Sequence, residues 1–198
     1  MLDTDELLHL ALKETQQGST EKAITYLKAC LQQEPKNADA QYLLGALHAE
    51  LGMYERAAEE MALALKIKPE LVTARFQLGL LQITSGNLEK SRETWQDLET
   101  LGAGHPLYLF KEGLLDLADN NFETCIEKLK KGIALNKENE ALNNDMLAMI
   151  AKAQEALNEQ NVTSTATPTV TEQDQRPPKT VTLTAYQSDE DKPEGSSH

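Results

Sequence analysis

Four histidines and two cysteines are the residues of this sequence best suited to bind a metal or to act in catalysis. His9, His48 and His105 lie far apart along the chain, and His198 is its last residue. No His or Cys pair has zinc-ligand spacing, and neither a phosphate-binding Gly-rich loop nor a nucleophile-elbow motif is present. The residues therefore predict no enzymatic activity, no metal site and no cofactor. We interpret His48 as a core histidine with a hydrogen-bond partner.

Glycine, alanine and proline recur at a fixed interval of 34 residues. The aligned positions are Gly45, Gly79 and Gly113; Gly18, Gly52 and Gly86; Ala23 and Ala57; and Pro35 and Pro69. This interval is typical of stacked helical hairpins. Glycine in the first series is needed because a side chain there would hold the two helices of a hairpin apart. The second series permits the tight turn between the helices.

These residues resemble the tetratricopeptide repeat, which combines a large apolar residue, Leu-Gly, an aromatic, an Ala, a bulky apolar residue and a closing Pro. One copy consists of Leu44, Gly45, His48, Ala57, Met61, Ala64 and Pro69. It departs from the pattern at His48, where an aromatic is usual, and at Gln41, where a large apolar residue is usual. Copies in the same phase precede and follow it. A degenerate fourth copy has Asn120 for the turn glycine and Lys137 for the closing proline.

The repeats predict an all-α fold. The resemblance implies a right-handed superhelical α-solenoid of helix hairpins, closed by a C-terminal capping helix with a polar outer face. We expect a repeat domain over residues 1–158, with repeats near 4–37, 38–71, 72–105 and 106–139 and the cap over 139–158. The individual helices are expected near 4–16, 38–50, 54–67, 72–84, 88–101, 106–118 and 122–135, with a further helix between Ser19 and Pro35.

Local signals mark several helix ends and core positions. Asp3 and Glu6 have the spacing of a capping box at the first helix, and Pro106 is expected to open a helix after a Gly-rich link. Trp95 is at a bulky packing position, so it is expected to fill the core. Cys30 and Cys125 lie three repeats apart, too far for the Cα separation of a disulfide, and are expected to be buried free thiols.

The composition excludes some partners. A net charge of −13 disfavours binding to nucleic acid or to anionic lipid. The N-terminus lacks the basic and apolar regions of a secretory signal, and no apolar stretch approaches the length of a membrane span. The sequence therefore predicts a cytoplasmic protein without direct membrane insertion.

The first helix of each hairpin has more apolar residues than contact with neighbouring helices requires. Two columns of residues follow the 34-residue step, and two further residues extend them by a turn. In tetratricopeptide repeat proteins, the corresponding edge lines a concave groove that binds peptides. The resemblance thus implies a peptide-binding groove at Leu8, Leu12, Tyr42, Ala46, Phe76, Leu80, Ile83, Phe110, Leu114 and Leu117. The alternative is that helices in a small stack bury such a broad face against one another.

We expect Tyr42, Phe76, Leu80, Phe110 and Leu114 to be exposed, because a contiguous exposed apolar surface usually marks a binding site. The columns lack the Lys, Asn and Arg residues with which related chaperone adaptors bind a terminal carboxylate.

The apolar columns on the first helices predict that the protein is a non-enzymatic adaptor or chaperone-like assembly factor. It would bind an apolar segment of a partner protein, with basic flanks because the repeats are acidic. The alternative function is a structural module that self-associates through the same columns.

Residues 159–198 are rich in Thr, Pro, Ser, Gln and acids, which predicts a disordered tail. Within it, Val181, Leu183 and Tyr186 belong to an alternating segment that has no core of its own. This segment could be a short binding motif, or it could fold back into the groove in place of a partner.

Overall fold

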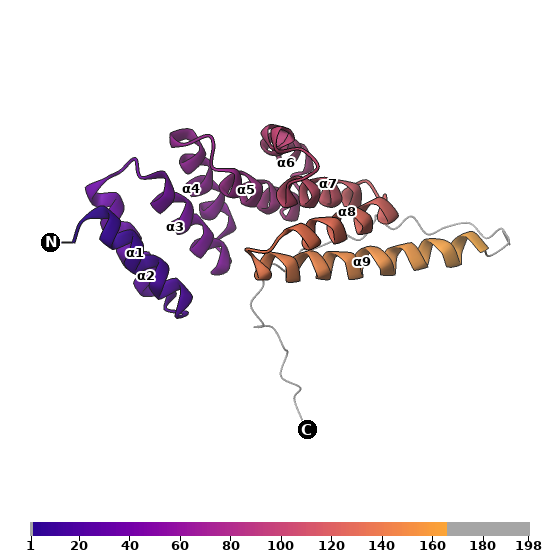
Figure 1. Cartoon of the computed structure of the whole chain (residues 1–198), viewed down its shortest axis with the longest axis horizontal. Helices are drawn as coiled ribbons and strands as arrows, with labels where there is room; N and C mark the ends of the chain where they lie inside the picture. The colour runs from indigo at the N-terminus through magenta and orange to yellow at the C-terminus, as the bar shows by residue number, and fades with distance from the viewer. Residues whose placement is uncertain (1, 166–198) are drawn as a thin grey trace, which may run out of the picture. The chain divides into compact units, whose positions relative to one another are not determined.

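The computed structural model describes residues 2–165, and the side chains of residues 2–161. All regular structure in this part of the chain is helical, which confirms the all-α fold (Figure 1). The helices are α1 (Thr4–Gln16), α2 (Thr20–Gln33), α3 (Ala38–Glu50), α4 (Tyr54–Ile67), α5 (Val72–Thr84), α6 (Leu88–Trp95), the 3₁₀ helix η1 (Gln96–Leu101), α7 (Pro106–Ala118), α8 (Phe122–Leu135) and α9 (Glu140–Thr165).

The described chain falls into two compact units, residues 2–78 and 79–165, with the division inside α5. In the first unit, α1 and α3 both pack on α2, and α3 packs on α4. One continuous apolar core joins α1, α2 and α3, and it contains Leu7, Ala11, Ala23, Leu27, Cys30, Ala40, Leu44 and Leu47. In the second unit, α8 packs against both α7 and α9.

The turns inside the hairpins require a left-handed backbone. Gly18, Gly52 and Gly86 have φ of 72°, 73° and 79° at the corresponding turns. Asn120 has φ of 60° at the fourth turn, and among the described residues it is the only one other than glycine with positive φ. Asparagine tolerates this conformation better than most residues, so the fourth hairpin keeps the same turn without glycine.

Two glycines of the repeating series allow close contact between the helices of a hairpin. A Cβ added at Gly79 would lie 2.1 Å from Nε1 of Trp95, and one added at Gly113 would lie 2.7 Å from Cδ2 of Leu129. Trp95 is buried as expected, and its indole ring packs directly on the α5 backbone. Cys30 and Cys125 are buried and free, which confirms that prediction.

The prediction of one continuous helix over residues 88–101 is wrong. The α-helix α6 ends at Trp95, and the chain continues as the 3₁₀ helix η1. Gly102, with φ of 68°, follows η1. A 3₁₀ helix rises about 2.0 Å per residue and turns more tightly than an α-helix. This geometry buries Leu98 and brings the Glu99 carboxylate to the ammonium of Lys111 in α7.

Helix α9 covers α8 but is longer than the predicted cap over 139–158. Its buried face contains Leu142, Met146, Met149, Ile150 and Ala153, which follow one another at the three- and four-residue steps of one helix face. Asn136 and Asn143 hold its start against the end of α8. The Asn136 side-chain amide donates to Oδ1 of Asn143 at 2.8 Å, and the Asn143 amide donates to the Asn136 carbonyl at 3.0 Å.

Helix α9 differs from α5 and α7, the first helices of two earlier hairpins, at the aligned glycine position. Leu147 lies 34 residues after Gly113, and its side chain is 52% exposed. A leucine there would prevent the close approach that Gly79 and Gly113 allow in their hairpins. The side chain therefore obstructs the stacking of a further helix on α9 in the manner of the earlier hairpins.

Candidate functional site

The predicted groove residues on α5 and α7 are not exposed. Phe76 and Phe110 are 0% exposed, and Leu80, Leu114 and Leu117 are also buried. The expectation that Phe76, Leu80, Phe110 and Leu114 lie at the surface is therefore wrong. Ile83 is half-buried.

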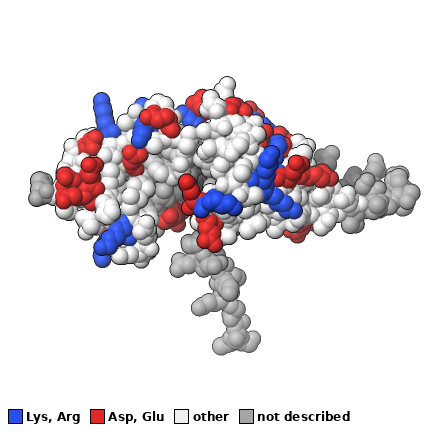
Figure 2. All heavy atoms as spheres, viewed as in Figure 1, with Lys and Arg blue, Asp and Glu red and all other residues white. Residues whose placement is uncertain are grey.

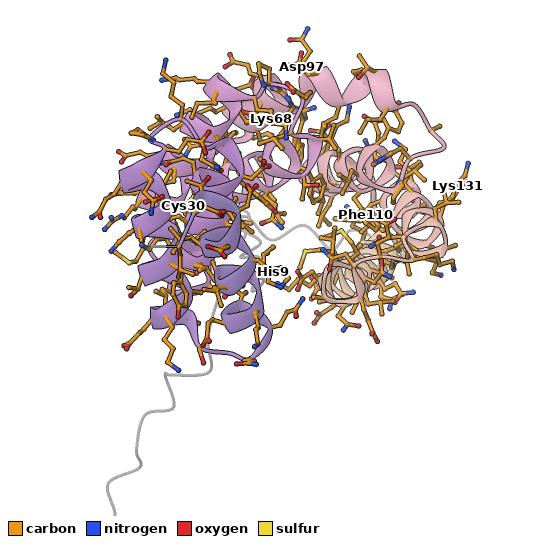
Figure 3. The ribbon with its side chains drawn as sticks, turned by 60° about the vertical axis from the view of Figure 1, so that its left-hand side comes forward. His9, Cys30, Lys68, Asp97, Phe110 and Lys131 are labelled. Atoms are coloured by element: carbon orange, nitrogen blue, oxygen red, sulfur yellow. The ribbon has the colours of Figure 1, made fainter. Side chains whose placement is uncertain are left out.

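The predicted groove residues on α7 are buried because neighbouring helices cover them. A Cβ at Gly132 of α8 would lie 2.5 Å from Cε1 of Phe110, so the ring rests on this glycine inside the hairpin. Helices α8, α9 and η1 all contact α7. Figure 3 shows Phe110 among the helices of its unit. The alternative interpretation, a broad face buried by helix packing, accounts for these positions.

Helix α5 is buried around most of its circumference. Besides Phe76 and Leu80, its buried residues include Ala74, Leu78 and Leu81. A helix that is apolar on nearly all sides is typical of the interior of a fold. The apolar column on α5 is therefore part of the core.

The four predicted residues on α1 and α3 remain accessible in the first unit. Leu12 is 44% exposed, and Leu8, Tyr42 and Ala46 are half-buried. Leu8 packs partly on the core formed by α1, α2 and α3. Because Leu8 and Leu12, and likewise Tyr42 and Ala46, are four residues apart, each pair lies on one side of its helix. We call the surface formed by Leu8, Leu12, Tyr42 and Ala46 the α1–α3 face.

Acidic side chains flank the α1–α3 face. Asp5 and Asp39 are exposed three residues before Leu8 and Tyr42, and Glu50 follows Ala46 by one helical turn. Burial raises the pKa of Glu50. Helix α3 contains no lysine or arginine. Asp39 pairs with Lys68, the residue after α4, whose Nζ is 3.5 Å from Oδ2. These carboxylates attract cations to the α3 side of the face, while exposed Lys13 follows Leu12 on the α1 side.

Tyr42 is the aromatic residue of the α1–α3 face. Burial raises the pKa of its hydroxyl to about 12, so the hydroxyl is uncharged at neutral pH. A tyrosine with an apolar ring and a neutral polar group is a common anchor in protein interfaces, because the ring excludes water while the hydroxyl still makes a hydrogen bond. Exposed His9 is on the same helix as Leu12 and points away from the α1–α2 pair (Figure 3).

His48 belongs to a buried ionic cluster in the second hairpin and not to a binding site. Its Nδ1 is 2.6 Å from Oε2 of Glu60, and Nε of Arg56 donates to Oε1 of the same carboxylate at 3.2 Å. The prediction of a core histidine with a partner is confirmed. The sequence did not indicate that the partner is Glu60, because the contact joins two helices.

A second ionic cluster lies in the fourth hairpin and was not predicted. Lys111 is 1% exposed, and its Nζ contacts the carboxylates of Glu99 and, at 3.0 Å, Glu112. Lys128 of α8 pairs with Glu112 at 3.3 Å and with Asp116 at 2.7 Å. Burial alone would raise the pKa of Glu112, but hydrogen bonds and charges from Lys111 and Lys128 lower it overall. All these charges have partners, so the cluster stabilises the η1–α7–α8 packing.

The described part of the folded chain has few groups arranged for metal binding or catalysis. Within residues 2–161, no group of three or more His, Cys, Asp or Glu side chains is arranged to hold a metal ion. None of the described helices combines the length and apolar character needed to cross a membrane. On the face drawn in Figure 2, acidic and basic side chains of the described residues are interspersed.

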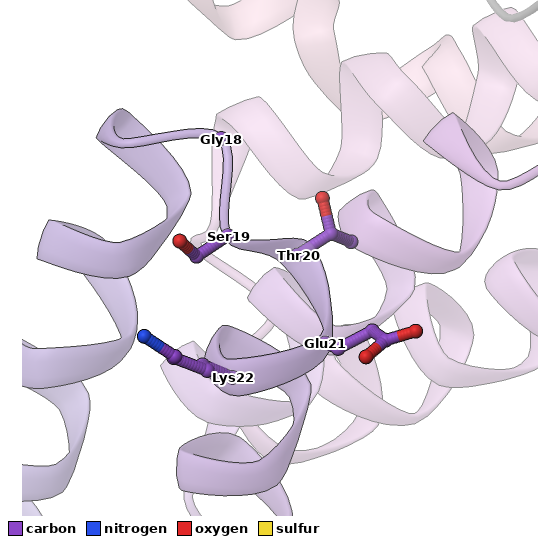
Figure 4. Close-up of a pocket in the computed structure, with 5 residues that line it drawn as sticks. All are labelled: Gly18, Ser19, Thr20, Glu21 and Lys22. Atoms are coloured by element: carbon purple, nitrogen blue, oxygen red, sulfur yellow. The ribbon is translucent and has the colours of Figure 1, made fainter.

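An open depression of about 350 Å³ lies at the turn between α1 and α2. It is lined by Gly18, Ser19, Thr20, Glu21 and Lys22. Figure 4 shows the Ser19 and Lys22 side chains on one side of the chain and those of Thr20 and Glu21 on the other. The side chains do not converge on a common point, so this depression is a feature of the turn.

Comparison with known proteins agrees with the helical hairpins. Residues 14–70 match the family model of the tetratricopeptide repeat. This match identifies residues 14–70 as a tetratricopeptide repeat segment, and helical hairpins continue through the rest of the described chain. None of the curated proteins compared with the chain matches it.

Several solved structures share the fold at low sequence identity. MamA 41-end from Desulfovibrio magneticus RS-1 has a TM-score of 0.57 and 20% identity, over 83% of this chain and 97% of that one. TTC0263, a thermophilic TPR protein of Thermus thermophilus, has a TM-score of 0.64 and 19% identity, over 79% and 85%. The APC/C hetero-tetramer Cut9–Hcn1 has a TM-score of 0.70 and 18% identity, over 80% of this chain but 31% of that one.

Proposed function

We propose that this protein is a non-enzymatic interaction module, an adaptor or chaperone-like assembly factor, that binds an apolar segment of a partner protein on its α1–α3 face. The observation that carries the proposal is the accessibility of this apolar surface. Leu12 is 44% exposed on α1, and Leu8 on α1 and Tyr42 and Ala46 on α3 are half-buried, while Phe76, Leu80, Phe110 and Leu114 at the aligned positions of α5 and α7 are buried. Apolar surface that the fold leaves accessible is a common feature of protein-binding sites.

The acidic flanks define the chemistry of the partner segment. Asp5, Asp39 and Glu50 lie beside the apolar residues, so Lys or Arg next to an apolar stretch would gain favourable electrostatic interactions. The proposed ligand is therefore an apolar segment with basic flanks. Exposed charge pairs are screened by salt, so binding should weaken as ionic strength rises.

The experiment uses a synthetic peptide in which alternating Leu and Thr residues lie between lysine pairs. Leu12→Asp should weaken its binding to the full chain by about 2–4 kcal/mol, which is roughly 30-fold or more, because it removes an apolar anchor. The matched control is Leu63→Asp, since Leu63 is 46% exposed on α4 of the same unit. The control should bind like the wild type.

Thermal unfolding of the same variants separates lost binding from lost folding. Both substitutions place a charge at an accessible position, so both should keep nearly the wild-type melting temperature. Equal affinity of the Leu12→Asp and Leu63→Asp variants for the peptide would refute the proposed site. Binding that does not depend on salt would refute the basic flanks.

Self-association is the second candidate, and the exposed side chain of Leu147 favours it. Leu147 is 52% exposed on the outer face of α9, next to exposed Ala148 and Ala151. Two copies could bury this residue against each other. Light scattering of the dilute full chain should then give a dimer mass that Leu147→Asp reduces to the monomer mass.

A further inference from the structure

We propose that two copies of this chain pair through the outer faces of α9, with the two helices antiparallel. The inference rests on self-association, the second candidate function, and it names the surface and the register of the pair. It does not depend on peptide binding at the α1–α3 face. All the residues that form the proposed contact belong to one helix.

The side of α9 that faces away from α8 is exposed and has the spacing of a coiled-coil seam. Helix α9 lies along α8 (Figure 1), and its buried residues face that helix. On the opposite side, Asn144, Ala148, Ala151 and Glu155 are exposed and follow one another at steps of four, three and four residues. This spacing keeps them in one line along a helix. We call these four residues the outer face of α9, and Leu147, which is 52% exposed, borders one edge of it.

The charges along the other edge of the outer face are complementary to a second copy. Asp145 and Lys152 are half-buried there and lie on the same side of α9, because two helical turns separate them. In an antiparallel pair with Ala148 of each copy beside Ala151 of the other, each Asp145 lies beside Lys152 of the other copy. The twofold axis then generates two identical ion pairs. A parallel pair in register would leave these two charges about 10 Å apart along the helix axis.

The other residues of the outer face also fit this register. Alanine at the two central positions lets the helix axes approach to about 8 Å, the lower end of the usual range. The same alignment places the Asn144 amide beside the Glu155 carboxylate of the other copy, where it can donate a hydrogen bond. Burial raises the pKa of Asp145, so a cation from a second copy would stabilise its charged form. One helix from each copy makes a small interface, so we expect a dimer that dissociates on dilution.

The test measures the dimer Kd of the full chain by sedimentation equilibrium over a series of protein concentrations. Asp145→Lys or Lys152→Asp would place like charges together at both symmetric contacts, so each should raise the Kd about tenfold. The matched controls are Glu127→Lys and Lys131→Asp, which make the same changes of charge at exposed positions of α8. Both controls should keep the wild-type Kd.

Mixing the two charge-reversal variants tests the antiparallel register itself. The Asp145→Lys variant has lysine at both positions and the Lys152→Asp variant has aspartate at both, so an antiparallel heterodimer contains two Lys–Asp pairs. With a fluorescent label on one variant, we expect the mixture to form heterodimers about as tightly as the wild type forms its dimer. A mixture that associates as weakly as the separate variants would overturn the proposal.

A milder substitution keeps the test valid if a charge reversal disturbs the fold, which thermal unfolding of each variant would show. Lys152→Gln removes the charge and keeps most of the side chain, so it should raise the Kd about threefold. An unchanged Kd for Lys152→Gln would contradict the ion pair, as would charge reversals that behave like the α8 controls.

Two further variants distinguish failure of this inference from failure of the proposed function. If Leu147→Asp dissociates the dimer while the charge reversals do not, self-association through α9 stands and the antiparallel register is refuted. A wild-type chain that stays monomeric at every concentration would refute self-association as well. Leu12→Asp, which tests the α1–α3 face, should leave the dimer Kd unchanged, and a dimer that it dissociates would move the contact away from α9.

Discussion

Substitution of Gly79 by alanine tests the close packing on which the hairpin geometry depends. The added Cβ would lie 2.1, 2.4 and 2.5 Å from Nε1, Cε2 and Cδ1 of Trp95. Non-bonded heavy atoms reach their optimum separation near 3.5–4.0 Å, so the ring or the helix must move by more than about 1 Å. Trp95 is 1% exposed, so its ring cannot turn out into solvent without displacing the residues that cover it.

Overpacking of this kind typically costs about 1–3 kcal/mol. In a chain of this size, each kcal/mol lowers the melting temperature by about 2–4 °C, so Gly79→Ala should lower it by roughly 2–12 °C. The assay is thermal unfolding followed by circular dichroism and by fluorescence of Trp95, the single tryptophan of the chain. The control is Gly104→Ala, where an added Cβ has no atom within 4 Å.

A double-mutant cycle with Trp95→Leu attributes the cost to this contact. If the indole ring is the obstacle, Gly79→Ala should cost much less in the Trp95→Leu background than in the wild type. An unchanged melting temperature for Gly79→Ala, or the same cost in both backgrounds, would refute the close-packing argument.

Three further predictions follow from the buried residues. Phe110→Asp should destabilise the fold by about 3 kcal/mol or more, because it removes a fully buried ring and buries a charge. A melting temperature like that of the wild type would indicate that Phe110 lies at the surface. Burial raises the pKa of Cys125 to about 12, so thiol reagents at pH 8 should label it only after denaturation, and rapid labelling of the native protein would contradict its burial. Burial also raises the pKa of Asp145, so its charged form destabilises the folded state at pH 7. Asp145→Asn should therefore have a higher melting temperature than the wild type at pH 7. This difference in melting temperature should disappear as the pH falls through the raised pKa of the folded state to below the pKa of the unfolded chain, near 3.9. A difference that grows on acidification would contradict the prediction.

The helix positions followed from the sequence because their determinants are local. Asp3 and Glu6 form the predicted capping box, with the Glu6 amide donating to Asp3 at 2.8 Å and the Asp3 amide donating to Glu6 at 2.9 Å. Glycine at the turns and proline after the second helices act on the backbone of their own residue and its neighbours. The start of η1 had no such local signal, since residues 88–101 keep an apolar pattern compatible with one helix.

The burial of the candidate site could not be predicted from the 34-residue columns. Leu12 and Leu114 occupy aligned positions, yet Leu12 is 44% exposed and Leu114 is 1% exposed. The column gives the side of the helix on which a residue lies, but its exposure depends on which helices cover that side. For α7 those helices include η1, which was not expected, and α9.

Ion pairs between side chains of different helices also could not be predicted from the sequence. Nothing in the sequence marks Lys111 as buried, but η1 and α7 together bury it, with its ammonium in contact with Glu99 and Glu112. Such contacts depend on the relative rotation of two helices. A repeat pattern defines this rotation only for the residues that are common to all repeats.

Methyl NMR of the full chain maps where the lysine-flanked peptide binds. On titration of the peptide, we expect shifts at the methyl groups of Leu8, Leu12 and Ala46, with those of Leu63 and Leu147 unchanged. Shifts confined to Leu63 or Leu147, or no shift at Leu12 under saturating peptide, would contradict binding at the α1–α3 face.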